Sequence, residues 1–326
     1  MHRRLPLSLA LPLLFLASAA LLGLSLALGS VPISLPELAS VLTTDAPSLA
    51  RDIVLELRLP RAMAAFAIGG LLALSGAILQ VLLRNPLADP YVLGVSGGAS
   101  VAALIAIMLG LPAAAVDGFA ALGALAACLL VFALAQGPGA WTPTRLLLTG
   151  IVVAAGAGSI VSLLLALGDE NQLRGMVFWM LGDLSRVQHW PWLLALLGAA
   201  AAAGLALGRH LNVLARGPTQ AASVGLDVGR LQVLLFVLTS VLTGCAVSAA
   251  GSIGFVGLVT PHLVRLALGS DNRIVLPVAA VLGGVVLMTA DLAARVLIAP
   301  RQLPVGALTA LVGVPLFLLL MSRQRS

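Results

Sequence analysis

Three ionisable side chains of this 326-residue chain lie in apolar sequence, where their chemistry is most informative. His262 and Arg265 stand three residues apart at the end of a run that begins at Gly251 and contains Gly254, Gly257 and Pro261. Asp291 stands midway along a later apolar segment. Charged groups are expensive in a lipid environment, so such residues indicate either a transport path or ion pairs that fix helix positions.

Asp291 leaves two interpretations open. An unpaired carboxylate in a membrane costs roughly 2.5–3.5 kcal/mol on insertion scales. A proton relay through Asp291 would make the chain an ion-coupled secondary transporter, but such proteins place several paired carboxylates or broken helices in internal repeats. We therefore favour a structural role, in which Asp291 pairs with a nearby arginine or caps a broken helix.

His262 and Arg265 share one face of a helix, which predicts internal packing and hydrogen bonding. No Cys, Glu or second His stands near His262, so we predict no metal site. A membrane-embedded enzyme would need several converging His, Asp or Glu residues within the apolar segments, and the sequence offers none. We therefore expect neither catalytic residues nor a cofactor on this chain.

Composition places these residues in a membrane protein. Apolar residues make up 60% of the chain, charged residues 9%, and the mean hydropathy is +1.12. A soluble domain carries about 25% charged residues, so lipid must solvate most of this surface. Segments of about 20 apolar residues predict membrane-spanning helices. The ten predicted spans are Leu5–Gly29, Ala62–Leu83, Tyr91–Leu109, Ala113–Ala135, Leu146–Leu167, Trp190–Gly208, Leu231–Ala249, Ile253–Leu268, Ile274–Ile298 and Val305–Met321.

The expected fold is thus an all-α polytopic domain over residues 1–326. The first segment has a second interpretation, a secretory signal cleaved near Ala17-Ser18-Ala19, but its apolar stretch exceeds the 7–15 residues typical of a signal core. If both termini are cytoplasmic, 11 arginines lie inside and 7 outside, the bias that the positive-inside rule requires. We predict that orientation, with an outer loop over residues 30–57 whose prolines interrupt any helix.

The inner loop over residues 209–230 contains a short helix signal. Pro218 suits the first turn of a helix and Gly225 suits its end, which predicts about two turns from Pro218 to Val224. A small helix in a cytoplasmic loop is a natural contact for a soluble partner. A second short amphipathic stretch, from Asn171 to Leu184, lies outside and is too short to span the membrane.

Several functions are excluded by what the sequence lacks. There is no Lys, and hence no phosphate-binding loop of the GxxxxGK[ST] type. Arginines are scattered singly between apolar segments, whereas a nucleic-acid surface would cluster them. Cys128 and Cys245 lie within apolar segments and are interpreted as small core residues.

Eight separated blocks, in order and spacing, resemble the FecCD-type permeases of ATP-binding-cassette importers for vitamin B12, ferric siderophores and haem. The blocks are Arg58-Leu59-Pro60-Arg61, Asn85-Pro86-Leu87-Ala88-Asp89-Pro90, Gly94-Val95-Ser96, Arg145-Leu146-Leu147-Leu148-Thr149-Gly150, Trp179-Met180-Leu181-Gly182, the Gly251–Arg265 run, Ala290-Asp291-Leu292-Ala293-Ala294-Arg295, and Leu303-Pro304-Val305-Gly306 with Thr309 and Gly313-Val314-Pro315.

This resemblance implies partners and site residues. It implies a homodimer with one pore on the dyad, two copies of a cytoplasmic ATPase that binds ATP and Mg, and a periplasmic binding protein. It assigns a cytoplasmic gate to Asn85 and Thr144, and docking of binding-protein carboxylates to Arg58, Arg61 and Arg295. We expected Arg58 and Arg61 to stand at a helix start, where an anion would offset the helix dipole. The residues assigned to ATPase coupling are Pro218, Thr219, Gln220, Ala221, Ala222, Ser223, Val224 and Gly225.

Two positions depart from the family pattern. Gln302 stands where an acidic residue is usual, and Gly217-Pro218 replaces the usual Gly-Glu at the coupling helix. The implied substrate is an iron complex, haem or a ferric siderophore, carried across the bacterial inner membrane; cobalamin is the alternative within the same family.

Overall fold

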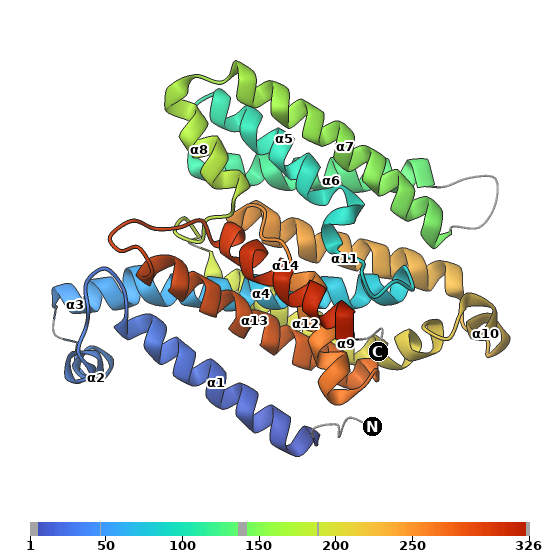
Figure 1. The fold of residues 1–326 in the computed structure, drawn as a ribbon, viewed down its shortest axis with the longest axis horizontal. Coiled ribbons are helices and arrows are strands. Elements are labelled where there is room, and N and C mark those ends of the chain that lie inside the picture. Colours follow the sequence, from blue (N-terminus) through green and yellow to red (C-terminus); the bar gives the residue numbers. More distant parts are fainter. Residues whose placement is uncertain (1–5, 46, 136–141, 188, 324–326) are drawn as a thin grey trace.

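The structure is a computed structural model that describes residues 6–45, 47–135, 142–187 and 189–323. Arg3, Arg4, Leu5 and Arg325, which entered the predictions of orientation and of the first span, lie outside these residues. Within them every regular element is a helix, which confirms the all-α prediction (Figure 1).

The helices follow one another with short connections. They are α1 (Leu7–Ala27), α2 (Leu35–Thr43), α3 (Leu49–Asp52), π-helical η1 (Ile53–Arg58), α4 (Leu59–Leu82), 3-10 helix η2 (Pro90–Leu93), α5 (Val95–Met108), α6 (Ala113–Ala135), α7 (Pro143–Leu167), α8 (Glu170–Met180), α9 (Trp190–Leu214), α10 (Pro218–Ser223), α11 (Val228–Ala250), α12 (Val256–Leu268), α13 (Asn272–Val296) and α14 (Val305–Arg323).

Among the described residues, seven helices are long and apolar enough to cross a membrane, and α5, α12 and α14 are shorter apolar helices. Their places match the predicted spans, while the number of crossings stays a prediction. The interpretation of the first segment as a helix of the bundle is favoured, because α1 packs against α13 and α4.

Helix α4 forms the centre of the fold, and α9, α11, α12 and α13 pack around it. This packing requires glycine at two crossings. A methyl group at Gly69 would lie 2.2 Å from the Gly283 carbonyl oxygen on α13, and one at Gly76 would lie 1.9 Å from the Gly257 carbonyl oxygen on α12. The backbones therefore touch directly, as small residues permit between membrane helices.

Helices α5, α6 and α7 form a second group, which lies above α11 and α4 in Figure 1. Most of α7 faces away from the rest of the chain, since only Leu146, Gly150, Ala157 and Val161 are buried in it. A methyl group added at Gly156 or Gly158 would meet nothing within 4 Å outside its own helix in the described chain, so contacts within one subunit do not require glycine at either position.

The outer segment over residues 30–57 differs from its prediction as an unstructured loop. Ser34 and Glu37 form a reciprocal capping box that begins α2, and Pro36 lies in the first turn, where proline needs no hydrogen-bond donor. Farther along, Leu49–Leu82 is one continuous helical stretch of 34 residues. Pro60 therefore does not start a helix; a π-turn precedes it, in which the Leu59 N–H reaches the Val54 carbonyl.

Two further helix boundaries differ from those that the sequence predicted. Asp291 lies in the last two turns of α13 rather than midway along the span, because α13 ends at Val296. Helix α12 begins only at Val256, since Gly251 and Phe255 adopt positive φ angles of 73° and 70°. The segment between them is irregular and connects α11 to α12.

Candidate functional site

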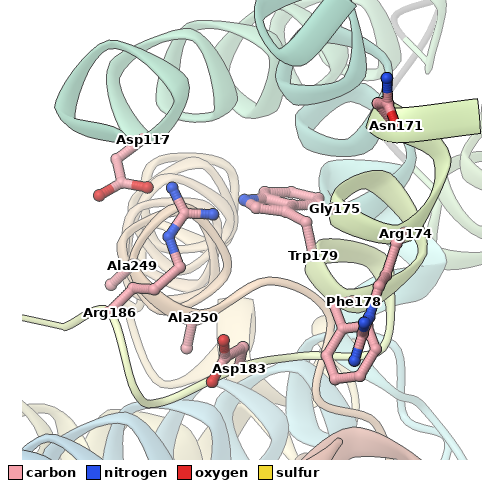
Figure 2. A pocket seen from close by; sticks show the side chains of 10 residues that line it. All are labelled: Asp117, Asn171, Arg174, Gly175, Phe178, Trp179, Asp183, Arg186, Ala249 and Ala250. Carbon is pink, nitrogen blue, oxygen red and sulfur yellow. The ribbon is translucent and has the colours of Figure 1, made fainter. Parts of the chain in front are cut away.

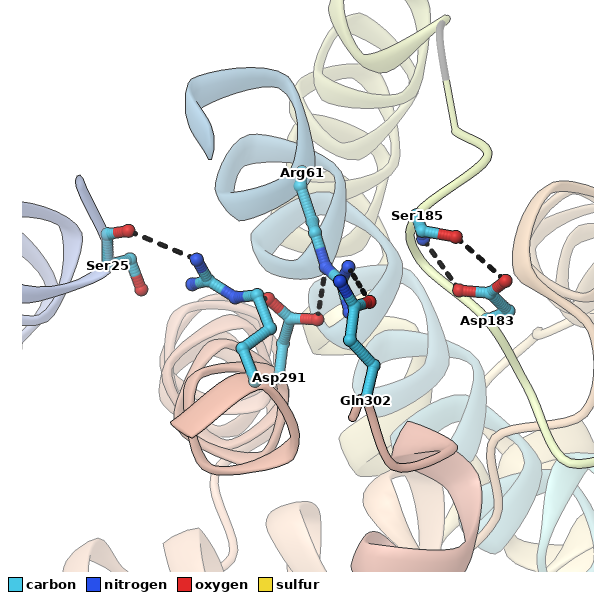
Figure 3. Close-up of polar contacts among 7 residues, drawn as sticks. Ser25, Arg61, Asp183, Ser185, Asp291 and Gln302 are labelled. Carbon is cyan, nitrogen blue, oxygen red and sulfur yellow. Dashed lines mark hydrogen bonds and ion pairs between the residues drawn. The ribbon is translucent and has the colours of Figure 1, made fainter. Parts of the chain in front are cut away.

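A buried cluster of charged groups joins the C-terminal ends of α1 and α13 to the N-terminal end of α4. The Asp291 carboxylate is 1% exposed and lies between two arginines: Arg61 Nε is 2.7 Å from Oδ1, and Arg295 Nε is 3.0 Å from Oδ2. Arg61 Nη1 also donates to Gln302 Oε1 at 2.7 Å (Figure 3). The prediction that Asp291 pairs with arginine is thereby confirmed.

The same cluster reaches α1 through its backbone. Arg295 Nη1 donates to the Ser25 carbonyl at 3.3 Å. Arg58 Nη1 donates to the carbonyls of Leu26 and Ala27 at 2.7 and 2.8 Å, and its Nη2 donates to Val31. The carbonyls of Ser25, Leu26 and Ala27 are the last of α1 and have no partner within the helix, so arginine satisfies them.

The prediction that the docking arginines stand at a helix start was therefore wrong. Arg58 and Arg61 lie inside a continuous helix, so no helix start disfavours their charge. Arg58, Arg61 and Arg295 are buried and hydrogen-bonded within the chain. All three nevertheless line a cavity of about 650 Å³ together with Glu56 and Gln302.

Ser252 and Ile253, in the irregular segment before α12, connect that segment to η2 and α5. Tyr91 Oη donates to the Ile253 carbonyl at 2.9 Å and accepts from the Ile253 N–H at 2.7 Å. Ser96 and Ser252 hydroxyls are 2.6 Å apart. Sequence reasoning identified these blocks but not their mutual contacts, because residues more than 150 positions apart carry no local signal.

The external motif at 179–182 packs on the same segment. The N–H groups of Val305 and Gly306 donate to the carbonyls of Gly182 and Leu181 at 3.2 and 3.0 Å. A methyl group at Gly251 would lie 2.0 Å from the Trp179 carbonyl oxygen, so only glycine fits there. Three motifs that are far apart in the sequence thus meet at one junction.

His262 and Arg265 face the interior, as predicted. Arg265 donates to the Gln80 side chain through Nη1 and to the Ala77 carbonyl through Nη2 at 3.3 Å. His262 lies edge-on to Phe317, with ring centroids 6.1 Å apart. These contacts connect α12 to α4 and α14. Among the described residues, no group of three His, Cys, Asp or Glu side chains could hold a metal ion.

The predicted coupling helix forms α10 and ends at Ser223, with Val224 at its cap. Ala221 is buried and anchors it, since the Ala221 N–H donates to the Gly217 carbonyl at 2.9 Å. Its other residues are exposed, including 70% of the Val224 side chain. The remaining exposed coupling residues are Pro218, Thr219, Gln220, Ala222, Ser223 and Gly225.

The two predicted gate residues lie on different elements. Asn85 follows α4, and its Oδ1 accepts from the Leu87 N–H at 2.9 Å. Thr144 is exposed in the first turn of α7. No hydrogen bond between them is found in the described part of one subunit, and their role as a gate stays a prediction.

Comparison with known proteins decides the family. The chain matches the model of the FecCD transport family over residues 15–323. The chain belongs to this family. Its members are membrane permease subunits of ABC importers and do not carry the ATPase themselves.

Two relatives and one solved structure show how far the similarity extends. The hemin transport system permease protein HmuU of Yersinia pestis is 40% identical over 96% of this chain and 97% of its own length. The vitamin B12 import system permease protein BtuC of Vibrio cholerae is 41% identical over 85% of each chain. A solved transporter assigned to the metal-chelate ABC type, in an inward-facing conformation, superimposes with a TM-score of 0.85 at 30% identity over 95% of this chain and 97% of its own.

The chain is therefore a multi-pass protein of the bacterial inner membrane and a permease of the metal-chelate, haem or vitamin B12 type of ABC importer. Its family implies that it works with an ATPase and a substrate-binding protein.

Proposed function

We propose that this chain carries an iron complex, haem or a ferric siderophore, inward across the membrane while a separate subunit hydrolyses ATP. The observation that supports this substrate class is the similarity to the hemin permease, which extends over 327 residues and nearly all of both chains. Cobalamin is the second candidate, since the vitamin B12 permease matches at similar identity over 282 residues.

The test of the substrate is ATPase activity in liposomes that contain the permease, its ATPase and the cognate binding protein. Hemin, a ferric siderophore and cobalamin are added separately at equal concentration. Stimulation and uptake with an iron complex alone support the proposal. Stimulation by cobalamin alone assigns the chain to the alternative substrate.

The translocation unit is proposed to be a homodimer with the pore on its dyad and both termini cytoplasmic. Helix α7 supports this arrangement, because an apolar face with open glycines at Gly156 and Gly158 suits either lipid or a second subunit. Crosslinking of single cysteines on this face distinguishes the two, since a lipid-facing helix would give no dimer.

Helix α10 is proposed to dock in a groove of the ATPase. Val224 presents an apolar side chain to the cytoplasm, and fully burying a valine side chain contributes roughly 1.5–3 kcal/mol. Val224→Asp should weaken co-purification of the ATPase about tenfold. Leu35→Asp is the matched control, because Leu35 is 75% exposed at the start of α2 on the opposite side. Equal ATPase recovery with both variants contradicts docking through α10.

The arginine-lined cavity is proposed to receive carboxylates of the binding protein. Arg58, Arg61 and Arg295 contribute three positive charges, against one negative charge each from Asp291 and Glu56. Arg295 Nη2 also has no hydrogen-bond partner among the described residues. The net charge of the groups around the cavity is thus positive, and Arg295 Nη2 is a donor that a carboxylate could engage.

Reversing the charge of these arginines is a poor test, because each is buried and its substitution would also disturb the packing of the helices. Glu56 is exposed at the cavity and offers a better one. Glu56→Gln should raise the association rate of the binding protein several-fold at low salt, since a rim charge acts mainly on the on-rate. Asp52→Asn, an exposed acid that does not line the cavity, is the control. An unchanged or slower rate for Glu56→Gln would contradict an incoming anion.

A further inference from the structure

A polar pocket of about 430 Å³ lies at the outer ends of α6 and α11, beside α8. Figure 2 shows the Asp117 carboxylate, the Arg186 guanidinium and the Trp179 indole nitrogen pointing toward one shared space. Asp117 is within electrostatic range of Arg186 and His189, yet no ion pair within 4 Å joins it to either in the described chain. The pocket therefore holds an anion and a cation that face each other across a gap.

The other two charges in the pocket are already engaged. Asp183 accepts hydrogen bonds from the backbone N–H and hydroxyl of Ser185, both at 2.8 Å. Arg174 stacks over the Phe178 ring, 5.6 Å from its centroid. Asp117, Arg186 and Trp179 therefore converge on the pocket and offer one acceptor group and two donor groups, while the exposed Asn171 side chain lies apart from them (Figure 2).

An apolar groove of about 380 Å³ runs along the same two helices. It is lined by Ala121, Ala124, Leu125, Cys128, Leu129 and Phe132 on α6, and by Val233, Phe236, Val237, Ser240, Val241, Gly244 and Cys245 on α11. Asp117 stands one helical turn from Ala121, and Ala249 of the pocket stands one turn from Cys245. Residues four apart share a helix face, so pocket and groove follow one another on one face of the pair.

The groove has the length of one lipid leaflet. From Ala121 to Phe132 a helix rises about 17 Å at 1.5 Å per residue, close to half of the ~30 Å hydrocarbon core. Phe132 and Phe236 pack together at its inner end, with ring centroids 5.5 Å apart. Trp192, 58% exposed at the start of α9, marks the headgroup level six residues after Arg186, since tryptophan gathers at that interface.

We propose that this face holds one phospholipid with a primary ammonium headgroup, of the phosphatidylethanolamine type. Its phosphate accepts from Arg186 and the Trp179 indole N–H, its ammonium donates to Asp117, and one acyl chain fills the groove. Arginine suits phosphate because its planar donors match the oxygens. A pocket with both signs of charge suits a zwitterion, whereas an anionic lipid would meet Asp117 unpaired.

The leaflet, but not the binding, rests on the proposed orientation. With both termini cytoplasmic, the pocket faces the periplasm and the lipid comes from the outer leaflet. The lipid would lie along the contact between α6 and α11, through which the α5–α7 group meets the core.

The test is native mass spectrometry of the purified permease in detergent, a measurement that needs neither transport nor a known orientation. Dioleoyl phosphatidylethanolamine, dioleoyl phosphatidylglycerol and glycerophosphoethanolamine, which lacks acyl chains, are added in turn. Retention of phosphatidylethanolamine at least fivefold above phosphatidylglycerol is expected. Equal retention of the two lipids, or equally tight binding of glycerophosphoethanolamine, would overturn the proposal.

Substitutions in the polar pocket and in the apolar groove test where the lipid binds. Arg186→Gln and Asp117→Asn should each weaken phosphatidylethanolamine binding about tenfold, the loss typical of a charged hydrogen bond. Ala121→Phe should weaken it as well, because an exposed position at the top of the groove is filled while the polar pocket is left intact. Arg301→Gln, at an exposed arginine elsewhere, is the control and should bind like the parent. Parent-like binding by the first three variants would place the lipid elsewhere and refute the assignment.

Discussion

Replacing Asp291 by Asn tests whether the buried charge cluster holds the outer ends of the helices together. Asn keeps the shape of the side chain but removes the negative charge between Arg61 and Arg295. The side chains of these two arginines are 10% and 7% exposed, so water cannot replace the lost carboxylate. Both cations would then remain buried and would repel each other.

The magnitude follows from the burial of the pair. Removing one partner of a buried ion pair destabilises a protein by about 3–5 kcal/mol, because an uncompensated charge is left behind. The matched control is Asp271→Asn. Asp271 pairs with Arg273 at 2.6 Å, but their side chains are 33% and 53% exposed. Exposed pairs contribute about 0–1 kcal/mol. Asp271 also caps α13 and accepts from Asn212, but Asn caps a helix about as well as Asp, so the control should lose much less stability than Asp291→Asn.

The assay is reversible denaturant unfolding in mixed micelles, followed by tryptophan fluorescence, for the parent and both variants. The free energy of unfolding should fall several times more for Asp291→Asn than for Asp271→Asn. Adding Arg295→Met to Asp291→Asn should restore part of the loss, since one of the two uncompensated cations is removed. Equal effects of the two Asn variants, or no recovery in the double variant, would refute this account of the cluster.

Three further predictions concern other parts of the chain. Burial raises the pKa of Asp89 to about 6, so the native state keeps this proton to higher pH than the unfolded state. Stability should therefore fall by about 2 kcal/mol as pH rises from 4 to 6, and Asp89→Asn should remove that fall in pH-dependent unfolding. Gly76→Ala should destabilise by at least 1–3 kcal/mol in the same unfolding assay, because its methyl group would overlap the Gly257 carbonyl. Single cysteines at Asn85 or Thr144, in a chain freed of its native cysteines, should crosslink between subunits in one nucleotide state more than in another.

These predictions have separate controls and contrary outcomes. Gly23→Ala, where nothing lies within 4 Å in α1, should stabilise slightly, so equal losses at both glycines would mean that helix contact is not the cause. For Asp89, parallel pH profiles of parent and variant would show that another group titrates. Equal crosslinking in every nucleotide state, or no crosslinking in any state, would contradict a gate at Asn85 and Thr144.

The sequence predicted the helical elements well where their signal was local. Apolar length located the helices, and Pro218 with Gly225 located α10 within one residue of its end. Asp291, in the ninth predicted span, was also predicted to pair with arginine. Each of these inferences depends on composition or on residues a few positions apart, which a single sequence records.

Its errors have physical causes that are not local. Pro60 was taken as a helix start, but a π-turn lets the helix run through it. The arginines near it were expected to stand at a helix start, whereas they lie within a continuous helix, where the end of α1 binds Arg58 and α13 binds Arg61. For the two arginines, contacts with Leu26, 32 positions away, and Asp291, 230 positions away, decide the outcome. The lipid-shaped face of α6 and α11 likewise exists only once the two helices are packed side by side.

The distribution of polar and apolar contacts indicates which parts of the permease move together. Asp291, Arg61 and Arg295 connect α1, α4 and α13 through buried charged bonds, which have strict geometry and are costly to break. The contact between α6 and α11 instead carries an apolar groove, and packed helices can shift past one another by small shear movements. We therefore expect alternating access to displace α6 and α7 against a core that the Asp291 cluster holds rigid, with the Ser96–Ser252 contact as the point of attachment. The proposed docking surface then lies on the rigid part, and the proposed lipid lies at the contact between α6 and α11, where the two parts move relative to each other.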